Sequence, residues 1–242
     1  MTTLTILIPT YNEEQALPET LAALARLAPQ PDEILLVDGK SEDRTVELAT
    51  AGGIRITIAP RKGKGAQINH GVEMASGELV CVLHADSTLP DDAVTVMRST
   101  MADDRTALAS FTPRFIGQRG TRWGSTINNW LKTWYLPLIA RPHLFLCGFR
   151  LLYGDHAMFF RRTQFIEVGG CDPHASVMEE ADMCIRLAQL GRVRMVPRWV
   201  WTSDRRIAAW GRWRANWVYF KMTVLWALGL RHRAAGHYPD IR

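Results

Sequence analysis

Carboxylate side chains follow three predicted strands of this chain, each close to the point where the strand ends. They are Glu13, Asp38 and Asp86. Parallel strands of an α/β sheet present their carboxyl ends at one edge, and ligands bind there. Turns favour Asp, Gly and Ser in any protein. Three strand ends that each carry a carboxylate nevertheless favour a shared pocket over three unrelated turns.

These residue types suit the recognition of a nucleotide diphosphate. Asp38 can accept hydrogen bonds from a base, and Glu13 could take the base or the ribose. Lys64, between two glycines, could meet the diphosphate. Asp86 could hold a divalent cation, Mn²⁺ or Mg²⁺, to neutralise a departing diphosphate. Alternatively, residues 61–65 are only a solvated loop, and they form no Walker A loop because no Lys-Ser or Lys-Thr pair ends them.

A second acidic group opens a predicted amphipathic helix over residues 179–190. Its members are Glu179, Glu180 and Asp182. Carboxylates near the N-terminus of a helix are favoured in the ionised form, which a general base requires. The same dipole favours an acidic first turn for stability alone, so on the helix by itself the two interpretations are equally good. The carboxylates at the strand ends favour catalysis.

The segments that must position these residues alternate between strand and helix patterns. We expect Asn12 to cap the first helix, Ser41 to cap the second, and Pro90 to open the helix after the fourth strand. The order implies an α/β fold with a mostly parallel sheet, helices on both faces and a C-terminal helical extension. The predicted strands are 4–9, 33–38, 54–59, 79–84, 107–112 and 156–161, and the predicted helices include 65–75, 179–190 and 208–228, with helical pieces between 123 and 153.

The length and composition fit one α/β domain with an added helical segment. Hydrophobic residues make up 47% of the 242 residues, enough for a sizeable core. We assign residues 1–206 to the catalytic domain and residues 207–242 to a basic, tryptophan-rich helical extension. The four cysteines form no CxxC pair, so no disulfide or zinc framework is supported, and a reducing cytoplasm fits.

The net charge of +5 is unevenly distributed along the chain. Residues 192–242 hold 11 Lys and Arg against 2 Asp and Glu, so the remainder is acidic. A basic, tryptophan-rich tail suggests an anionic partner: membrane headgroups, a phosphorylated substrate or nucleic acid. A solvated basic face is the alternative. We expect no transmembrane helix, because the apolar stretch 217–230 is shorter than the ~20 residues of a span, but peripheral contact with the inner face of a membrane stays open.

The strand-end residues resemble the motifs of the family-2 glycosyltransferases. That family's first strand ends in P-x-Y-N-E, as residues 9–13 do, and its second in V-D-G/D-x-S-x-D-x-T, as residues 37–45 do. The resemblance implies a nucleotide-diphospho-sugar transferase fold of the GT-A type and a nucleotide-sugar donor. The residues implied to contact that donor are Pro9, Tyr11, Glu13, Asp38, Lys64 and Asp86.

The metal motif of the resemblance is incomplete. Most relatives carry Asp-x-Asp after the fourth strand, whereas this chain has His84 in place of the first Asp. Asp86 is then the implied metal ligand. His84 joins the metal shell, bonds the ribose or is structural, and Mn²⁺ tolerates imidazole better than Mg²⁺ does.

Residues 179–182 resemble the family's E-D-x-D segment, in which the Asp of E-D is the general base. The resemblance implies that Glu180 is the base and that Glu179 lies on the acceptor side. Asp182 is the neighbour that could replace Glu180 in catalysis. This chain departs from the pattern because it carries the longer Glu at the position of the base.

Two further segments resemble functional parts of the family. Gly154, Asp155 and His156 resemble the start of its acceptor-side strand. Arg205 and Arg206 fall where the family places a loop that contacts phosphate, and two guanidinium groups could hold a diphosphate or an acidic acceptor.

A narrower resemblance covers almost the whole chain. It is to short bacterial family-2 enzymes labelled arsenosugar-biosynthesis glycosyltransferases, whose motifs read H-A-D-T, G-D-Q-x-x-F-x-R-R, M-E-D and T-S-x-R-R. This chain departs from them at Ser87, His156, Ala157 and Glu180. These departures bear on the acceptor more than on the fold.

The expected reaction is transfer of a sugar, with inversion, from a nucleotide diphosphate to an acceptor hydroxyl, with UDP favoured by family habit. A polyprenyl-phosphate glycosyltransferase at a membrane surface is the main alternative. A nucleotidyltransferase is a weaker alternative, because residues 9–12 replace its usual Gly-rich loop. A nucleic-acid binder would leave the clustered carboxylates unexplained, so we expect no nucleic acid as a partner.

Overall fold

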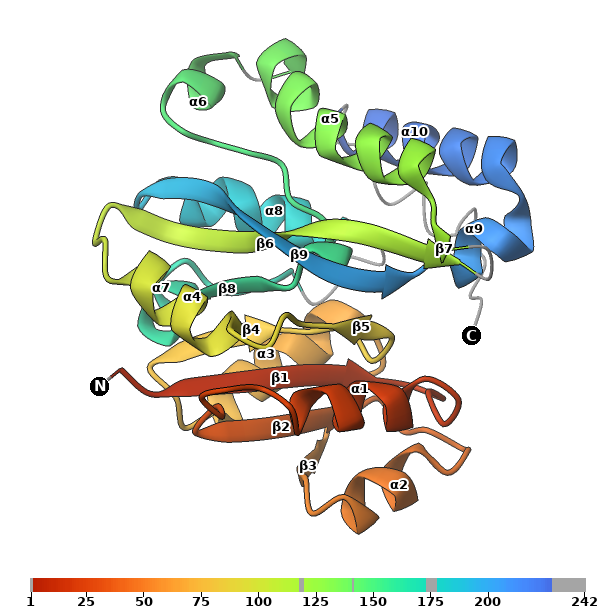
Figure 1. Ribbon diagram of the computed structural model, residues 1–242. Helices are drawn as coiled ribbons and strands as arrows, with labels where there is room; N and C mark the ends of the chain where they lie inside the picture. The colour runs from red at the N-terminus through yellow and green to blue at the C-terminus, as the bar shows by residue number, and fades with distance from the viewer. Residues whose placement is uncertain (1, 118–119, 141, 173–177, 228–242) are drawn as a thin grey trace.

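The computed structural model describes residues 2–117, 120–140, 142–172 and 178–227. Its centre is a nine-stranded sheet in the order β3-β2-β1-β4-β8-β6-β9-β5, with β7 paired to β6 (Figure 1). The strands are β1 Leu4–Thr10, β2 Glu33–Asp38, β3 Arg55–Ile58, β4 Leu79–Val82, β5 Ser87–Thr88, β6 Thr106–Gly117, β7 Gly120–Thr121, β8 Met158–Arg161 and β9 Arg192–Ser203.

The sheet is mostly parallel, as predicted. Strands β3, β2, β1 and β4 pair in parallel, and so do β6 and β9. Strand β8 runs antiparallel to both β4 and β6, which places these two in the same direction. The carboxyl ends of β1, β2, β4, β6 and β9 therefore lie at one edge.

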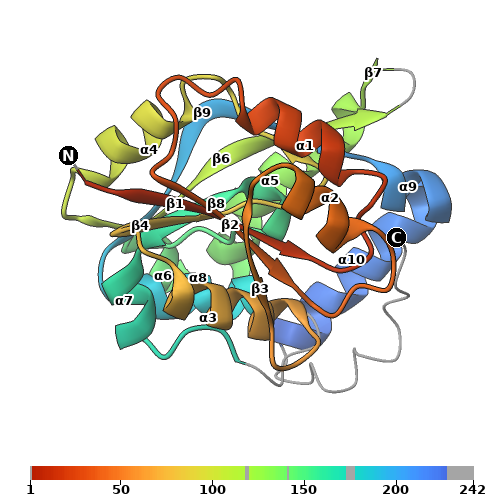
Figure 2. The same cartoon turned by 90° about the horizontal axis from the view of Figure 1, so that it is seen from below.

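Helices cover both faces of the sheet, which confirms that prediction (Figure 2). One core cluster packs α3, α7 and α8 against residues such as Leu7 and Phe160, and another packs α1 and α4 against residues such as Ile6 and Phe159. Alternate side chains of one strand therefore pack into the two core clusters on opposite faces of the sheet. The helices are α1 Leu17–Leu24, α2 Thr45–Ala51, α3 Lys64–Met74, α4 Ala93–Met101, α5 Trp123–Ala140, α6 Pro142–Leu146, α7 Arg162–Glu167, α8 Glu179–Leu187, α9 Arg205–Trp210 and α10 Arg212–Ala227, with a 3₁₀ turn at Gly154–His156.

The predicted helix caps were wrong. Asn12 lies in a left-handed loop conformation with φ of 55°, and α1 begins only at Leu17. Ser41 bonds the preceding strand end instead of α2, where the Asp43 carboxylate accepts from the N–H of Thr45 at 3.0 Å. Both cap residues serve the loops at the sheet edge, because those loops must satisfy their own backbone groups.

Two helix boundaries also differ from the predictions. Pro90 does not open a helix, since α4 begins at Ala93. The predicted helix 208–228 is two helices separated at Gly211, whose φ is 78°, and its last residue lies outside the described ranges.

Strand β9 was absent from the sequence-based prediction. Its sequence carries arginines at alternate positions and Pro197, a pattern unlike a buried strand. It is a long strand because it pairs in parallel with β6, with a register shift between Ser110 and Thr112. In the described part of the chain, no helix combines the length and the apolar character needed to cross a membrane.

Candidate active site

Arg205 joins two of the predicted carboxylates. Its Nη2 donates to Glu13 Oε1 at 2.9 Å, its Nη1 lies 2.8 Å from Glu13 Oε2, and its Nε lies 3.1 Å from Asp86 Oδ2. Glu13 follows β1, Asp86 follows β4, and Arg205 begins α9 directly after β9. Three distant segments therefore meet at the carboxyl edge of the sheet. Paired charges of this kind interact strongly when they are largely buried, as the two carboxylates are.

The short strand β5 holds Asp86 beside the end of β9. Ser87 pairs with Thr202 in an antiparallel ladder, and its Oγ donates to Thr202 Oγ1 at 3.0 Å. The N–H of Ser203 donates to the carbonyl oxygen of Asp86 at 3.2 Å. The position of Arg205 against Asp86 is thus set by backbone pairing and not by the ion pair alone.

Hydrogen bonds tie the loop after β1 to the loop after β2. The N–H of Asn12 donates to Ser41 Oγ at 2.8 Å, and the N–H of Glu42 donates to Asn12 Oδ1 at 2.9 Å. The N–H of Glu13 donates to Thr45 Oγ1 at 2.8 Å. Several side chains of the two sequence motifs are therefore used to join the loops, and this orients the Glu13 side chain.

Asp38 lies buried at the end of β2. Its carboxylate accepts hydrogen bonds from the N–H and Oγ of Ser41, at 2.8 and 2.5 Å, and from Thr10 Oγ1 at 3.3 Å. Gln67 of α3, which the sequence did not single out, donates to the carbonyl oxygens of Thr10 and Val37 at 2.6 and 2.9 Å. A carboxylate has about four lone-pair sites, so Asp38 keeps capacity for one ligand donor.

Three other predicted side chains converge on Gly154. A Cβ built there would lie 2.7 Å from His84 Nε2 and closer still to Lys64 Nζ and Glu180 Oε1. Lys64 begins α3, Glu180 lies in the first turn of α8, and His84 follows β4 two residues before Asp86. A side chain at this position would displace at least one of these groups, so glycine allows all three to meet here.

Lys64 pairs with both glutamates at the start of α8. Its Nζ donates to Glu180 Oε1 and lies 3.8 Å from Glu179 Oε1. Burial, and then the charge of Glu180, raise the pKa of the Glu179 carboxyl. Burial alone would also raise the pKa of Glu180, but the Lys64 ammonium and its hydrogen bond together hold it below its usual value. Glu180 is therefore the ionised member of the pair, as a base must be.

Asp155 and His156 lie in the 3₁₀ turn beneath α5. Asn129 Nδ2 of α5 donates to Asp155 Oδ2 at 2.9 Å and lies 3.4 Å from His156 Nε2. His156 is fully buried, and burial lowers its pKa to about 3, so the ring is neutral at physiological pH. Asp155 is only half-buried and is the more accessible of the two. No sequence signal pointed to Asn129, because it belongs to no recognised motif.

The remaining predicted residues lie around this edge. Tyr11 packs under Lys62, whose Nζ lies 4.9 Å from the ring centroid and 3.3 Å from the hydroxyl. Pro9 lies in β1, one residue before its last. Asp182 is half-buried in the first turn of α8. The side chain of Arg206 lies outside what the structure describes.

The described side chains at this edge carry more negative than positive charge, and this affects how a diphosphate and a metal ion could bind. Among the described side chains, the carboxylates of Glu13, Asp86 and Glu180 outnumber the cations of Lys64 and Arg205. A diphosphate would bind such a site poorly without further positive charge, because like charges would then lie close together.

The residues present fit a divalent cation that binds together with a diphosphate. In the described ranges, no group of three or more His, Cys, Asp or Glu side chains could hold a metal ion on its own. Mg²⁺ and similar ions, however, are usually held by one or two carboxylates together with substrate phosphates. Asp86, with His84 nearby, supplies a donor set of that kind.

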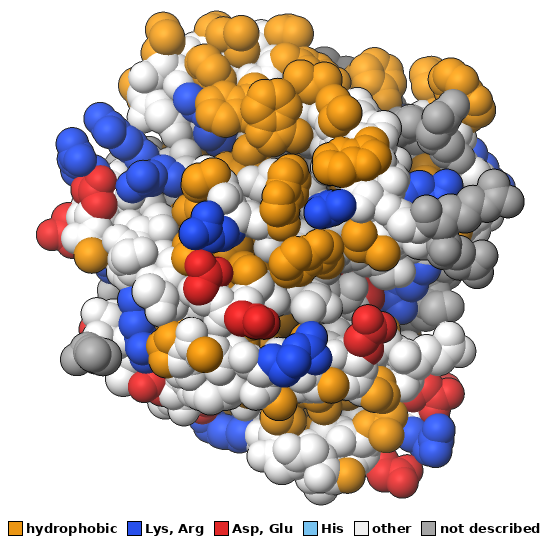
Figure 3. Space-filling view, in the orientation of Figure 1, with side chains coloured by type: hydrophobic (Ala, Val, Ile, Leu, Met, Phe, Trp, Pro, Cys, Tyr) orange, Lys and Arg blue, Asp and Glu red, His pale blue; other side chains and the backbone are white. Residues whose placement is uncertain are grey.

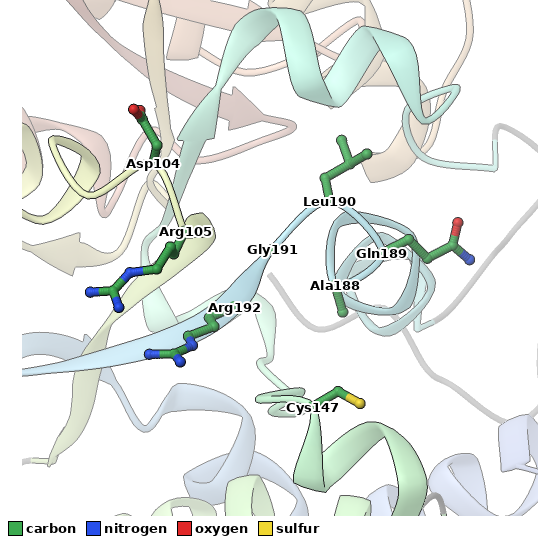
Figure 4. Close-up of a pocket in the computed structure, with 8 residues that line it drawn as sticks. All are labelled: Asp104, Arg105, Cys147, Ala188, Gln189, Leu190, Gly191 and Arg192. Carbon is green, nitrogen blue, oxygen red and sulfur yellow. The ribbon is translucent and has the colours of Figure 1, made fainter.

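Figure 4 shows a surface pocket, which lies near the start of β6 and of β9. Its lining includes Arg105, which precedes β6, and Arg192, which begins β9. The 12 residues of β9 separate it from Arg205, and at roughly 3.3 Å per residue the distance is more than 30 Å. None of the residues predicted for the site lines this pocket, so we assign the pocket no part in the site.

The sequence matches a known protein family. A family model described as glycosyl transferase family 2 matches residues 5–169. The chain belongs to this family. The match includes the three strand-end carboxylates and Lys64 but ends before α8 and Arg205, and it leaves the nucleotidyltransferase alternative without support.

Relatives in the family match different lengths of the chain. The probable glycosyltransferase YdaM of Bacillus subtilis is 28% identical over 229 residues, which are 88% of this chain and 54% of that protein. An undecaprenyl-phosphate 4-deoxy-4-formamido-L-arabinose transferase of Yersinia enterocolitica is 35% identical over 99 residues, 37% of this chain and 30% of that protein. The matches thus span about half or less of these curated relatives.

A solved structure supports the fold. The glucosyl-3-phosphoglycerate synthase of Mycobacterium tuberculosis, in complex with Mn²⁺, uridine diphosphate and phosphoglyceric acid, superposes with a TM-score of 0.65 at 19% identity. The likeness covers 99% of this chain and 80% of that one. It confirms the α/β fold of the GT-A type for this family-2 member.

Proposed function

We propose that this family-2 protein transfers a sugar from a nucleotide-diphosphate donor, a UDP-sugar, to an acceptor hydroxyl with inversion. One observation carries the proposal: the Glu180 side chain pairs with Lys64 and lies beside His84 at Gly154. His84 is two residues before Asp86, which pairs with Arg205. The proposed base and the residues proposed to bind the diphosphate thus lie at the same sheet edge. The structural neighbour that binds Mn²⁺ and uridine diphosphate supports the choice of donor.

The donor side of the site consists of Lys64, Arg205, Asp86 and the loop anchored by Asp38. Lys64 and Arg205 would bind phosphate oxygens, and both now pair with carboxylates that a diphosphate could displace. A divalent cation on Asp86, with His84 nearby, would supply Lewis-acid stabilisation of the leaving diphosphate. Arg206, which follows Arg205 in α9, would add a second guanidinium. Pro9, Tyr11 and Glu13 would line the base and the ribose.

The acceptor side consists of Gly154, Asp155 and the α8 carboxylates. Glu180 would take the proton from the acceptor hydroxyl as oxygen attacks the anomeric carbon from the face opposite the diphosphate, which inverts its configuration. When a diphosphate attracts Lys64, Glu180 loses its counter-charge and becomes a stronger base. His156 would support this side from the interior.

The division of the chain, its cellular location and its narrower resemblance form part of the same proposal. Residues 1–206 would form the catalytic domain, with residues 207–242 as a helical extension. The four cysteines are free thiols, which fits work in a reducing cytoplasm. The narrower resemblance to arsenosugar-biosynthesis enzymes would apply to the acceptor, which the site leaves unnamed.

A thermal-shift screen of nucleotide sugars, with and without Mn²⁺, tests the proposal. A ligand at a hundredfold excess over its Kd adds about 2.7 kcal/mol to the free energy of unfolding, or ~5–10 °C in Tm for a chain of this size. We expect a UDP-sugar to give such a shift only with the cation, and ATP to give none. The proposal fails if no nucleotide sugar shifts Tm in either condition.

Asp38→Ala should weaken the binding of UDP by about 1–3 kcal/mol, the usual cost of leaving a buried partner unpaired. Titration calorimetry measures the affinity. Ser41→Ala is the matched control, because it removes a hydrogen bond to Asp38 and keeps the carboxylate. If the two variants lose affinity equally, Asp38 serves only to hold the loop and does not read the base.

A polyprenyl-phosphate acceptor is the second candidate. The relative named as an undecaprenyl-phosphate transferase favours it, since it is 35% identical over the segment it shares. A phosphate acceptor is already ionised and needs no base. Glu180→Gln should then stay active with a short polyprenyl phosphate, and its inactivity would remove this candidate.

A further inference from the structure

The outer face of α10 exposes a stripe of large apolar side chains. Trp213, Trp217, Phe220 and Val224 recur every three or four residues, so they lie on one side of the helix. They are 81%, 66%, 53% and 38% exposed, and the rings of Trp217 and Phe220 stack with centroids 6.0 Å apart. A helix inside a soluble fold would direct such a stripe toward the core.

Helices α5 and α6 extend this apolar surface. Lys132 of α5 lies over the ring of Tyr219 of α10, with Nζ 5.8 Å from its centroid, so the two helices are neighbours. Of the 16 large apolar side chains that the described residues expose, 12 belong to α5, α6 and α10, and such clustering marks an interaction site. Figure 3 shows hydrophobic side chains gathered in the region where Figure 1 draws α5 and α6. The members besides the α10 stripe are Trp123, Ile127, Trp130, Leu131, Tyr135, Leu138, Ile139 and Leu146.

The charges on these helices have one sign. None of α5, α6 and α10 contains an Asp or a Glu, whereas α5 carries Lys132 and α10 carries Arg212, Arg214 and Lys221. A second copy of the chain would bring these cations face to face, which opposes association. Tryptophans with flanking cations are instead the composition of helices that lie in the interface of anionic membranes.

We propose that the surface formed by α5, α6 and α10 docks on an anionic lipid bilayer, with the helices lying in the headgroup region. Since none of these helices is long and apolar enough to span, the contact is peripheral. Both sides of the site connect to this surface: α5 supplies Asn129 to Asp155, and α9, which begins with Arg205, leads into α10. The docked enzyme would therefore hold its site close to the bilayer. This inference does not depend on the identity of the sugar or the nucleotide.

Vesicle flotation with the full chain tests the proposal, using phosphatidylcholine vesicles with and without phosphatidylglycerol. We expect binding to the anionic vesicles, with a blue shift of tryptophan emission. The double variant Trp213→Ser, Trp217→Ser should lower the partition coefficient at least ~10-fold, because it removes the largest apolar contacts. Arg214→Gln should lower it about fivefold on anionic vesicles and leave neutral vesicles unaffected.

The matched control is Ile58→Ser, Ile166→Ser, which changes two side chains of 48% and 50% exposure away from this surface. It should bind like the wild type, and far-UV circular dichroism checks that all variants are folded. Equal loss in the control would overturn the proposal, and so would failure of the wild type to bind either vesicle. A dimer of the wild type that the tryptophan variant dissociates and the control does not would also overturn the proposal. Vesicle binding that appears only after residues 228–242 are removed would overturn it as well.

Discussion

Glu180→Gln should lower the turnover of sugar transfer by ~10²–10⁴, the range for loss of a general base. The reason is the pairing at the start of α8, where Lys64 keeps Glu180 ionised while Glu179 has a raised pKa. Gln keeps the size and a hydrogen-bond acceptor but cannot take a proton. Initial rates with a UDP-sugar measure the loss, and UDP affinity should not fall, because the base acts on the acceptor and Lys64 is freed for the diphosphate.

Two neighbouring substitutions serve as controls for this assignment. Glu179→Gln and Asp182→Asn also remove a carboxylate from the first turn of α8, but they should cost far less turnover. If Asp182→Asn abolishes activity while Glu180→Gln remains active, the base is Asp182 and the motif alignment is off by two residues.

The pH profile gives an independent readout of Glu180. Its pKa is held below the usual value by Lys64, so activity is present above that pKa and is lost as the pH falls through it. Lys64→Met removes the ammonium but keeps the burial that raises the pKa. We therefore expect the acid limb of the variant's kcat/KM profile, which reports the free enzyme, to move to higher pH. An unmoved limb would mean that another group titrates.

Asp86→Ala should lower turnover by about 10² or more, comparable to the loss of a major electrostatic stabiliser of the transition state. Asp86 is the carboxylate placed to hold a divalent cation, and it also orients Arg205, with which it pairs at 3.1 Å. The variant should also need far more Mn²⁺ for half-maximal activity. A metal titration of initial rates measures both effects.

Glu13→Gln separates the two roles of Asp86. Glu13 pairs with the same guanidinium at 2.8 Å but is no implied metal ligand. It should lower activity through Arg205 while the Mn²⁺ requirement stays unchanged. Full activity of the wild type in EDTA would eliminate the metal from the proposal.

The parallel half of the fold could be predicted from local sequence. The strands at Leu4–Thr10 and Glu33–Asp38 are short, apolar and followed by turn residues, and alternation with helices implies a parallel sheet whose carboxyl ends share an edge. This reasoning correctly placed Glu13, Asp38 and Asp86 together at that edge. The prediction of this shared edge required only the chain order and the residue types, because parallel connections have few allowed topologies.

The pairing of these residues with partners far along the chain was beyond such reasoning. Strand β9 carries arginines and a proline, and it becomes a strand only because β6 lies beside it. That pairing, with β5, brings Arg205 to Asp86 across 119 positions. Non-local pairing of this kind leaves no periodic signal in the sequence.

The sequence by itself determined the family, the α/β class and the set of carboxylates that could bind a nucleotide sugar. Only the tertiary structure decided which carboxylate is paired with which cation. It placed Lys64 on Glu180, brought His84 to Gly154, and turned Asn12 and Ser41 from expected helix caps into ties between two loops. It also left the apolar stripe of α10 facing outward. Residue types set what chemistry is available, whereas distances and burial, which arise from contacts remote in sequence, set the protonation and direction of each group.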